Sequence, residues 1–100
     1  MTSTKNCLVF DLGAESGRAV LGRFDGTRLA LEEIHRFPNG PVRVLDSLYW
    51  DALRLFAEIK QGLAKAVSRA PDLVCLGLDT WGVDLALLDQ CGELLGNPYH

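Results

Sequence analysis

Apolar runs of strand length, separated by turn-forming residues, occupy the first third of the chain. Residues 7–12 (CLVFDL) and 17–24 (GRAVLGRF) are two such runs, and residues 28–37 (RLALEEIHRF) alternate loosely between apolar and polar positions. The sequence DGT at 25–27 is a turn signal between the second run and the third. Three strands joined by tight turns predict an antiparallel meander.

A helical pattern comes after a segment rich in turn formers (PNGPVRVLDS), which we expect to be a loop. Across residues 51–69 (DALRLFAEIKQGLAKAVSR), apolar side chains recur at three- and four-residue steps, with charged side chains opposite. Asp51 is expected to cap the start of this helix and Pro71 to close its end. The apolar positions on one face are Leu53, Phe56, Ile59, Leu63, Ala66 and Val67.

Two more apolar runs complete the pattern. Residues 73–79 (LVCLGLD) are continuously apolar, as expected of a central parallel strand reached by a helical crossover. After TWG, residues 83–89 (VDLALLD) predict another strand, and QCGE at 90–93 predicts a turn. The predicted order is therefore β-β-β-α-β-β in a mixed sheet. This α/β order opens the ribonuclease-H-like fold, which actin-like ATPases and several nucleases share.

Composition narrows the class of protein and of partner. The chain has 100 residues, 48% hydrophobic and 23% charged, which indicates one ordinary globular unit. Its net charge of −3 gives no electrostatic basis for binding nucleic acid or an anionic membrane. The first apolar run is too short for a signal peptide, and no run is long enough to span a membrane, so we expect a cytoplasmic location.

Three cysteines and two histidines have no ligand-like spacing. Cys7, Cys75 and Cys91 form no CxxC or Cys/His pattern, and their apolar contexts favour reduced thiols in the core of a cytosolic protein. His35 and His100 are interpreted as structural. The aromatic pair at 49–50 is expected to staple against the helix start, with a wall of a substrate pocket as the alternative.

The segment DLGAESGR joins the first two predicted strands and has two interpretations. Gly13 and Gly17 let the backbone bend, and successive N–H groups in such a bend form an anion-binding concavity to which Ser16 adds a hydroxyl. Asp11, just before the bend, repels phosphate directly but can hold Mg²⁺, usually through water. The alternative is a plain tight turn, which pattern alone favours.

The segment DTWGVD follows the predicted parallel strand. Asp79 ends that strand, and because the first and fourth strands are neighbours in this fold, Asp11 and Asp79 should reach the same edge of the sheet, where ligands bind. Trp81 offers a flat apolar wall, Gly82 close backbone access and Asp84 an acceptor for hydroxyls, a mixture that suits a sugar. The alternative is a turn with a core tryptophan.

Taken together, FDLGAESGR, EIHRFPNG, YWD and LGLDTWGVDLALLDQCGELLGNPYH resemble the rhamnulokinases, a branch of the carbohydrate kinases in the actin-like ATPase superfamily. The resemblance covers nearly the whole chain, and the order and spacing of the motifs are specific. It implies transfer of the γ-phosphoryl group of ATP to the 1-hydroxyl of L-rhamnulose. ATP, Mg²⁺ and the sugar are the implied ligands.

The resemblance also implies roles for individual residues. Asp11 lies near magnesium, with Asp79 as a possible second ligand. Glu15 is carried over for its backbone N–H alone, because relatives often have a small residue there. The residues expected to line the ATP phosphates are Gly13, Ala14, Glu15, Ser16, Gly17 and Arg18. Those expected to contact the sugar are Thr80, Trp81, Gly82 and Asp84.

The chain departs from this family in length. Its members are several times longer and have two actin-like domains, so residues 1–100 are expected to be the N-terminal part of the first domain, with the rest of that domain and the second one absent. The catalytic base and the adenosine pocket are assigned to no residue here. The chain alone is expected to be inactive, because phosphoryl transfer needs base, magnesium and both substrates held together.

Three alternatives stay open. One is a kinase for another ketose, polyol or sugar acid, which only the TWGVD region would distinguish. A remote one is a metal-dependent nuclease using Asp11, Glu58 and Asp79 around two metal ions; the glycine-serine turn has no role in that chemistry, and the acidic balance disfavours it. The last is a non-catalytic interaction module, although an isolated half-domain should expose a sheet edge and aggregate.

Overall fold

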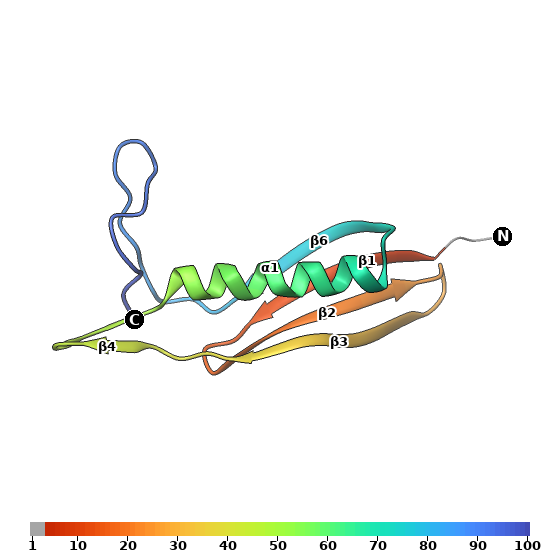
Figure 1. The fold of residues 1–100 in the computed structure, drawn as a ribbon, viewed down its shortest axis with the longest axis horizontal. Coiled ribbons are helices and arrows are strands. Elements are labelled where there is room, and N and C mark those ends of the chain that lie inside the picture. Colours follow the sequence, from red (N-terminus) through yellow and green to blue (C-terminus); the bar gives the residue numbers. More distant parts are fainter. Residues whose placement is uncertain (1–3) are drawn as a thin grey trace.

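A mixed sheet of four strands carries one helix on one of its faces (Figure 1). The computed structural model describes residues 4–100, and these residues measure 58 × 30 × 23 Å. The elements in chain order are β1 (Lys5–Leu12), β2 (Ser16–Phe24), β3 (Leu29–Pro38), β4 (Val42–Val44), β5 (Ser47–Tyr49), α1 (Ala52–Arg69) and β6 (Leu73–Thr80).

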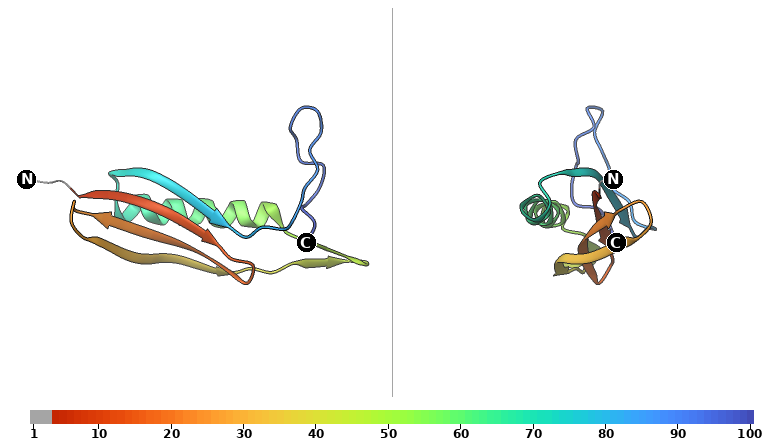
Figure 2. Two further views of the ribbon diagram at one scale, coloured as in Figure 1. Left: turned by 180° about the vertical axis from the view of Figure 1, so that it is seen from behind. Right: turned by 90° about the vertical axis from the view of Figure 1, so that its right-hand side faces the viewer.

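The sheet has the strand order β3-β2-β1-β6. β1 pairs antiparallel with β2, and β2 with β3, so the predicted meander is confirmed. β6 pairs parallel with β1 after the chain has crossed through α1, which confirms the helical crossover. Figure 2 shows the helix running along one side of the sheet. The carboxyl ends of β1 and β6 therefore meet at one edge.

Alternation along β1 decides which side chains reach the core. Leu8, Phe10 and Leu12 are buried beneath α1, whereas Cys7 and Asp11 lie on the opposite, uncovered face. Burying each large apolar side chain stabilises the fold by roughly 1.5–3 kcal/mol. The other buried apolar members of this core are Ala19, Leu21, Ile34, Phe37, Ala66 and Ala70.

The buried face of α1 differs in part from the predicted one. Gly62 and Ala66 are its buried residues, and a Cβ on Gly62 would lie 2.7 Å from the Phe10 ring. The small residues Gly62 and Ala66 therefore face the sheet and let the helix approach it closely. Ile59 packs against the core, as expected. Four of the predicted positions are instead exposed: Leu53, Phe56, Leu63 and Val67.

The predicted start and end of α1 are confirmed. The Asp51 side chain caps the helix by accepting from the backbone N–H of Arg54 at 3.1 Å. The helix ends at Arg69, before Pro71, and the N–H of Ala70 bonds back to Ala66.

The segment after β3, expected to be a loop, contains a short hairpin. β4 pairs antiparallel with β5 from Val42↔Tyr49 to Val44↔Ser47, around a two-residue turn in which Leu45 has φ 54°. Hairpin turns that need a positive φ usually have glycine, asparagine or aspartate at that position rather than leucine. The sequence of this segment therefore did not predict a hairpin.

The predicted strand at 83–89 is wrong. Only isolated bridges form there, Leu85↔Tyr99 and Leu88↔Leu94, because no continuous strand runs beside it to accept its hydrogen bonds. Val83 has φ 69°, which breaks the extended conformation at its start. The predicted order β-β-β-α-β-β is thus corrected to β-β-β-β-β-α-β, while the mixed sheet stands.

The last residues return to the start of α1. The N–H of Trp50 donates to the carbonyl of Pro98 at 2.8 Å, and the N–H of His100 donates to the carbonyl of Leu48 at 2.9 Å. Between β6 and this contact, the chain forms a loop that projects from the body of the molecule (Figure 1). Residues 48–52 and 97–100 are thereby joined into one local framework.

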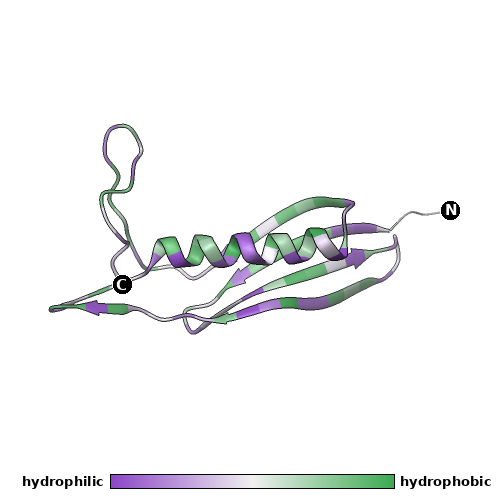
Figure 3. Ribbon diagram, viewed as in Figure 1, coloured by the Kyte–Doolittle hydropathy of each residue, from purple (hydrophilic) through white to green (hydrophobic). Residues whose placement is uncertain are grey.

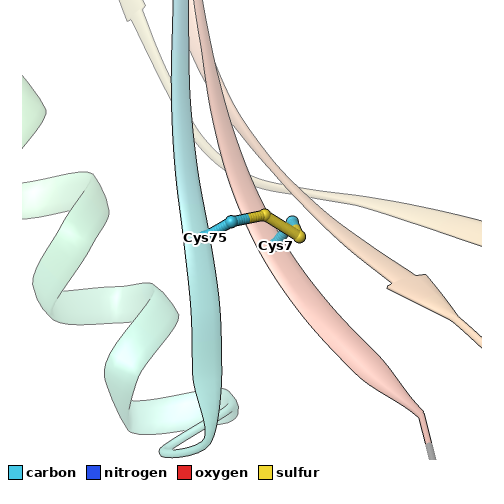
Figure 4. The surroundings of a disulfide bond; sticks show 2 residues. All are labelled: Cys7 and Cys75. Atoms are coloured by element: carbon cyan, nitrogen blue, oxygen red, sulfur yellow. A yellow bond between two sulfur atoms is a disulfide. The ribbon is translucent and has the colours of Figure 1, made fainter.

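The cysteine prediction is also wrong. Cys7 and Cys75 form a disulfide between β1 and β6 (Figure 4), and neither lies in the core. The cause is the register of the parallel pair, which places the two residues opposite each other with their Cα atoms 4.7 Å apart. Cys91 is free and exposed.

β6 is an edge strand with an apolar surface. Within residues 4–100 it pairs on one side alone, so the parallel pairing was predicted correctly but the central position was not. Val74, Leu76 and Leu78 are more than half exposed, because no further strand or helix among these residues covers them. The hydrophobic colouring along β6 is visible in Figure 3. Within residues 4–100, α1 is too polar to cross a membrane.

Candidate phosphate and sugar site

Two aspartates meet at the carboxyl edge of the sheet. Asp11 on β1 and Asp79 on β6 are register partners across the parallel pair, which confirms that both reach the same edge. Register partners in a sheet project from the same face, here the one that α1 does not cover. One or two carboxylates, completed by water and phosphate oxygens, are the ligands that Mg²⁺ prefers, so these residues fit that ion.

An arginine organises the Asp11 side of the edge. Arg18 on β2 lies opposite Asp11 and donates from Nη1 to its Oδ2 at 2.9 Å. Its Nη2 donates to the hydroxyl of Ser16 at 2.8 Å. Both charged side chains are partly exposed, so the ion pair orients the groups more than it stabilises the fold.

The turn between β1 and β2 is closed and braced. The N–H of Gly13 donates to the carbonyl of Ser16 at 2.9 Å. Asn39 follows β3 and braces this turn with two bonds: its Nδ2 donates to the carbonyl of Gly13 and its N–H to that of Glu15, both at 2.9 Å. Sequence reasoning missed this role of Asn39, although the turn signal PNG marks the position.

The two glycines of the turn are required for space rather than for an unusual φ. Neither Gly13 nor Gly17 has a positive φ. A Cβ on Gly13 would lie 2.7 Å from the carbonyl oxygen of Ser16, and one on Gly17 would lie 2.2 Å from the Phe37 ring. Gly17 therefore leaves room for a core aromatic ring directly behind the turn.

The turn leaves backbone donors for an anion. Among the hydrogen bonds within residues 4–100, none uses the N–H of Ala14 or of Glu15. Two successive free N–H groups beside an arginine form a site where a phosphate can be bound. The residues expected to bind the ATP phosphates therefore lie at the same edge of the sheet as Asp11 and Asp79.

The residues expected at the sugar gather beside the start of α1. Trp81 packs on Trp50 with ring centroids 4.4 Å apart, and its indole N–H donates to the carboxylate of Asp84. That bond engages the carboxylate that was expected to be a free acceptor. A cavity of about 210 Å³ is lined by Trp50, Leu55, Thr80, Trp81, Gly82, Asp84 and Pro98.

Trp50 is buried beside residues that are far from it in the sequence, so these neighbours could not be predicted from local pattern. It is 2% exposed, and the rings of Trp81 and His100 lie beside it, with centroids 4.4 and 5.3 Å away. Leu55 of α1 lines the same small cavity as Trp50. Nearby, a hydrogen bond with the Tyr49 hydroxyl raises the pKa of Tyr99 above its ordinary value of 10.0. Trp50 and Trp81 are therefore the two aromatic residues that line the 210 Å³ cavity.

Glu58 does not join the two aspartates. Its carboxylate lies 2.6 Å from Nε2 of His35 on β3, and Lys65 contacts the other ring nitrogen at 2.8 Å. These contacts are on the helix-covered face, opposite Asp11. Glu58 is therefore not placed to share a metal ion with Asp11 and Asp79, as the nuclease alternative requires. Among residues 4–100, no three side chains of His, Cys, Asp or Glu are grouped so that they could hold a metal ion.

Comparison with solved structures defines the class of fold. The chain superposes on a gluconate kinase from Lactobacillus acidophilus with a TM-score of 0.71 and 16% sequence identity. The match covers 97% of this chain and 20% of that one. The α/β fold predicted from the sequence, that of the actin-like ATPases and their sugar kinases, is thereby confirmed.

Comparison with curated proteins is more specific. Over 95 residues the chain is 45% identical to a rhamnulokinase from Bacteroides thetaiotaomicron, which confirms the resemblance carried by the motifs. That match covers 95% of this chain and 20% of the relative, so the chain spans about a fifth of the length of the proteins it matches. No protein-family model matches it.

Proposed function

We propose that this chain supplies the phosphate-facing part of an ATP-dependent carbohydrate kinase whose acceptor is L-rhamnulose. The observation that supports this most directly is the meeting of Asp11, Asp79 and the 13–18 turn at one sheet edge. In the proposal, residues 1–100 form the N-terminal part of the first actin-like domain of a cytoplasmic enzyme. The similarity to a rhamnulokinase favours this sugar over other ketoses, polyols and sugar acids.

The phosphate side of the proposed site acts by position and charge. The free N–H groups of Ala14 and Glu15 donate to phosphate oxygens, and Arg18 adds positive charge next to them. Ser16, Gly17 and Gly13 complete the turn. Bound Mg²⁺ would neutralise charge on the transferred group, with Asp11 holding it through water and Asp79 as the second carboxylate.

The sugar side combines a ring face with polar edges. Trp81 offers its ring to the apolar face of the sugar, and Gly82 gives access to the backbone. Thr80 bonds to sugar hydroxyls, as does Oδ1 of Asp84, the oxygen that the Trp81 indole does not engage. Phosphoryl transfer requires little covalent chemistry from the protein, so holding both substrates in line is the main contribution of these residues. The catalytic base lies outside this chain in the proposal.

A chimaera tests the proposal. The matching 95 residues of the Bacteroides thetaiotaomicron rhamnulokinase are replaced by this chain, and sugar-dependent ADP release is measured with L-rhamnulose, xylulose and L-fuculose. We expect turnover with L-rhamnulose above the other two sugars. Asp11→Asn should lower kcat by at least about 100-fold, because it removes the proposed magnesium-side carboxylate.

The matched control is Asp25→Asn, which changes an aspartate in the β2–β3 turn at the far end of the sheet and should leave turnover unchanged. Preference for xylulose or L-fuculose would replace the proposed acceptor by another sugar. A folded chimaera that binds ATP but phosphorylates none of the three would contradict the kinase proposal. The 100-residue chain by itself should release no ADP, and measurable turnover would show that it is sufficient alone.

A further inference from the structure

A disulfide joins the two strands that carry the aspartates of the candidate site. Cys7 on β1 and Cys75 on β6 are register partners, and their Cα atoms lie 4.7 Å apart (Figure 4). Asp11 and Asp79 are register partners four residues further along the same strands. Because alternate residues of a strand share a face, all four side chains project from the face that α1 does not cover. The bond therefore lies on the same surface as the two aspartates, about 13 Å away along the strands.

The middle of β6 is held to the sheet by little besides its backbone hydrogen bonds and this disulfide. Among the described residues, β6 pairs with β1 alone. Leu73 packs against the core at the start of the strand, and Trp81 packs against it after the strand has ended. Between these two anchors, Leu76 and Leu78 are exposed and Gly77 has no side chain to pack. The disulfide therefore contributes much of the attachment of this part of β6.

The two cysteines differ in their access to solvent. Cys75 is exposed, whereas Cys7 is half-buried. Thiol–disulfide exchange proceeds by attack of a thiolate on a sulfur of a disulfide, and its rate depends on access to the attacking thiol. Cys75 is therefore placed to react first with a small molecule, and Cys7 is placed opposite it to complete the bond. Cys91, which is free and exposed, lies in the segment after β6.

The compartment favours a bond that opens and closes. Disulfides in reducing compartments are usually transient and either catalytic or redox-sensing. The cytoplasmic location proposed above would place this pair in such a compartment, and for that point alone the inference rests on the proposed function.

We propose that Cys7 and Cys75 form a reversible redox pair, which exchanges with small-molecule disulfides of the glutathione class and controls how firmly β6 is attached to β1. In the oxidising direction, the Cys75 thiolate attacks one sulfur of glutathione disulfide, and a glutathione thiolate leaves. The Cys7 thiolate then attacks Sγ of Cys75, and the second glutathione thiolate leaves. The two leaving thiolates take up the two protons that the cysteine thiols have lost. The chain is thus oxidised by two electrons, and one glutathione disulfide is reduced to two thiols.

The two states differ at the candidate site. The closed bond helps to hold Asp79 in register with Asp11, whereas in the open state the middle of β6 is attached through its backbone hydrogen bonds alone. Neither ATP nor sugar takes part in this exchange.

A redox titration tests whether the bond is reversible. The Cys91→Ser chain, in which Cys7 and Cys75 are the two remaining cysteines, is equilibrated in mixtures of reduced and oxidised glutathione. After an acid quench, free thiols are labelled with a maleimide and counted by mass spectrometry. We expect a closed bond in oxidised glutathione and two free thiols in reduced glutathione. A bond that stays closed in reduced glutathione, or thiols that stay free in oxidised glutathione, would overturn the inference.

Single variants test the order of attack, in the Cys91→Ser background. In Cys7→Ser, oxidised glutathione should form an adduct on Cys75 that cannot be resolved. In Cys75→Ser, the adduct on the half-buried Cys7 should accumulate more slowly. Faster reaction at Cys7 would overturn the proposed order.

Hydrogen exchange followed by mass spectrometry tests the attachment of β6. The amides of residues 74–79 should exchange at least about tenfold faster in the reduced chain, because the covalent link no longer opposes local opening. Cys7→Ser should exchange like the reduced chain under both conditions, whereas Cys91→Ser, the matched control, should keep the full redox difference. No redox difference in β6 would overturn the inference. An equal difference in β3 would also overturn it, since the bond would then stabilise the whole fold.

These measurements are independent of turnover. A redox-dependent β6 together with an inactive chimaera would contradict the kinase proposal and leave the redox pair standing. An active chimaera, together with a pair that does not respond to glutathione, would do the reverse.

Discussion

At the scale of single residues, the glycines of the first turn show how packing and site geometry depend on the same positions. Gly17 lies at the edge where phosphate is proposed to bind. A Cβ at this position would collide with the Phe37 ring of the core. The backbone of the turn therefore packs directly against the hydrophobic core. A side chain at Gly17 would disturb the core packing and the geometry of the proposed phosphate site at once.

Gly17→Ala should destabilise the fold by about 1–3 kcal/mol, because the Phe37 ring must move away from a Cβ that would approach it to 2.2 Å. Gly40→Ala is the matched control, since a Cβ there meets nothing within 4 Å. Urea unfolding of both variants measures the difference. Equal stability of Gly17→Ala and the unaltered chain would contradict the packing role.

Asp25 gives a residue-scale prediction in pH. Its carboxylate accepts from the N–H groups of Arg28 and Thr27, and these bonds lower the pKa of Asp25 below its ordinary 3.8. Because the folded pKa is the lower one, the carboxylate stabilises the fold above about pH 3.8 and loses this effect as the pH falls further. Asp25→Asn should therefore differ most from the unaltered chain near neutral pH.

Urea midpoints measured at about pH 6 and about pH 3 check this dependence. The difference between the two proteins should shrink at the lower pH. A difference that stays constant between the two conditions would mean that the turn bonds do not depend on ionisation.

At the scale of elements, the start of α1 is stabilised by the capping side chain of Asp51. Asp51→Ala removes the bond to the Arg54 N–H and should lower the free energy of unfolding by about 0.5–2 kcal/mol. Asp51→Ser keeps a capping oxygen and should recover most of that loss. Thermal unfolding followed by circular dichroism compares the two, and identical losses would show that the cap contributes nothing.

Elements were predictable where a single local pattern decided them. The run at 7–12 and the periodic positions of 51–69 predicted a strand and a helix close to those observed. The face of α1 was not predictable, because Gly62 and its fit against Phe10 matter only once the sheet is present. The segment 83–89 alternates like a strand, but a strand also requires a neighbour, which local pattern does not reveal.

The site was predictable to a similar extent. Asp11 and Asp79 could be brought to one edge from strand order alone. The bond from Trp81 to Asp84 and the support from Asn39 and Trp50 depend on long-range packing, and no local spacing signals it. The cysteine pair was missed because two thiols that are 68 residues apart become neighbours through register.

At the scale of the whole molecule, β6 presents an exposed, apolar edge of the sheet. Its outer edge has unpaired backbone groups, and Val74, Leu76 and Leu78 expose apolar surface along it. Such an edge can pair with a second copy of the chain. We therefore expect self-association that grows with protein concentration.

Leu76→Lys should reduce this association, because a charge on an edge strand opposes pairing. Leu95→Lys makes the same change in the projecting loop and should leave the association unchanged. Sedimentation velocity over a range of concentrations measures both. A monomer at every concentration for the unaltered chain would contradict the expectation.

The bond between Cys7 and Cys75 has a consequence for the covalent connectivity of the molecule. It closes a ring that contains β2, β3, the β4–β5 hairpin and α1, while the residues after Cys75 form a tail outside it. A protease that cuts once inside the ring, for example in the hairpin turn, opens the chain without separating its pieces. The nicked molecule should run as one species on a gel until reductant is added, and then as two.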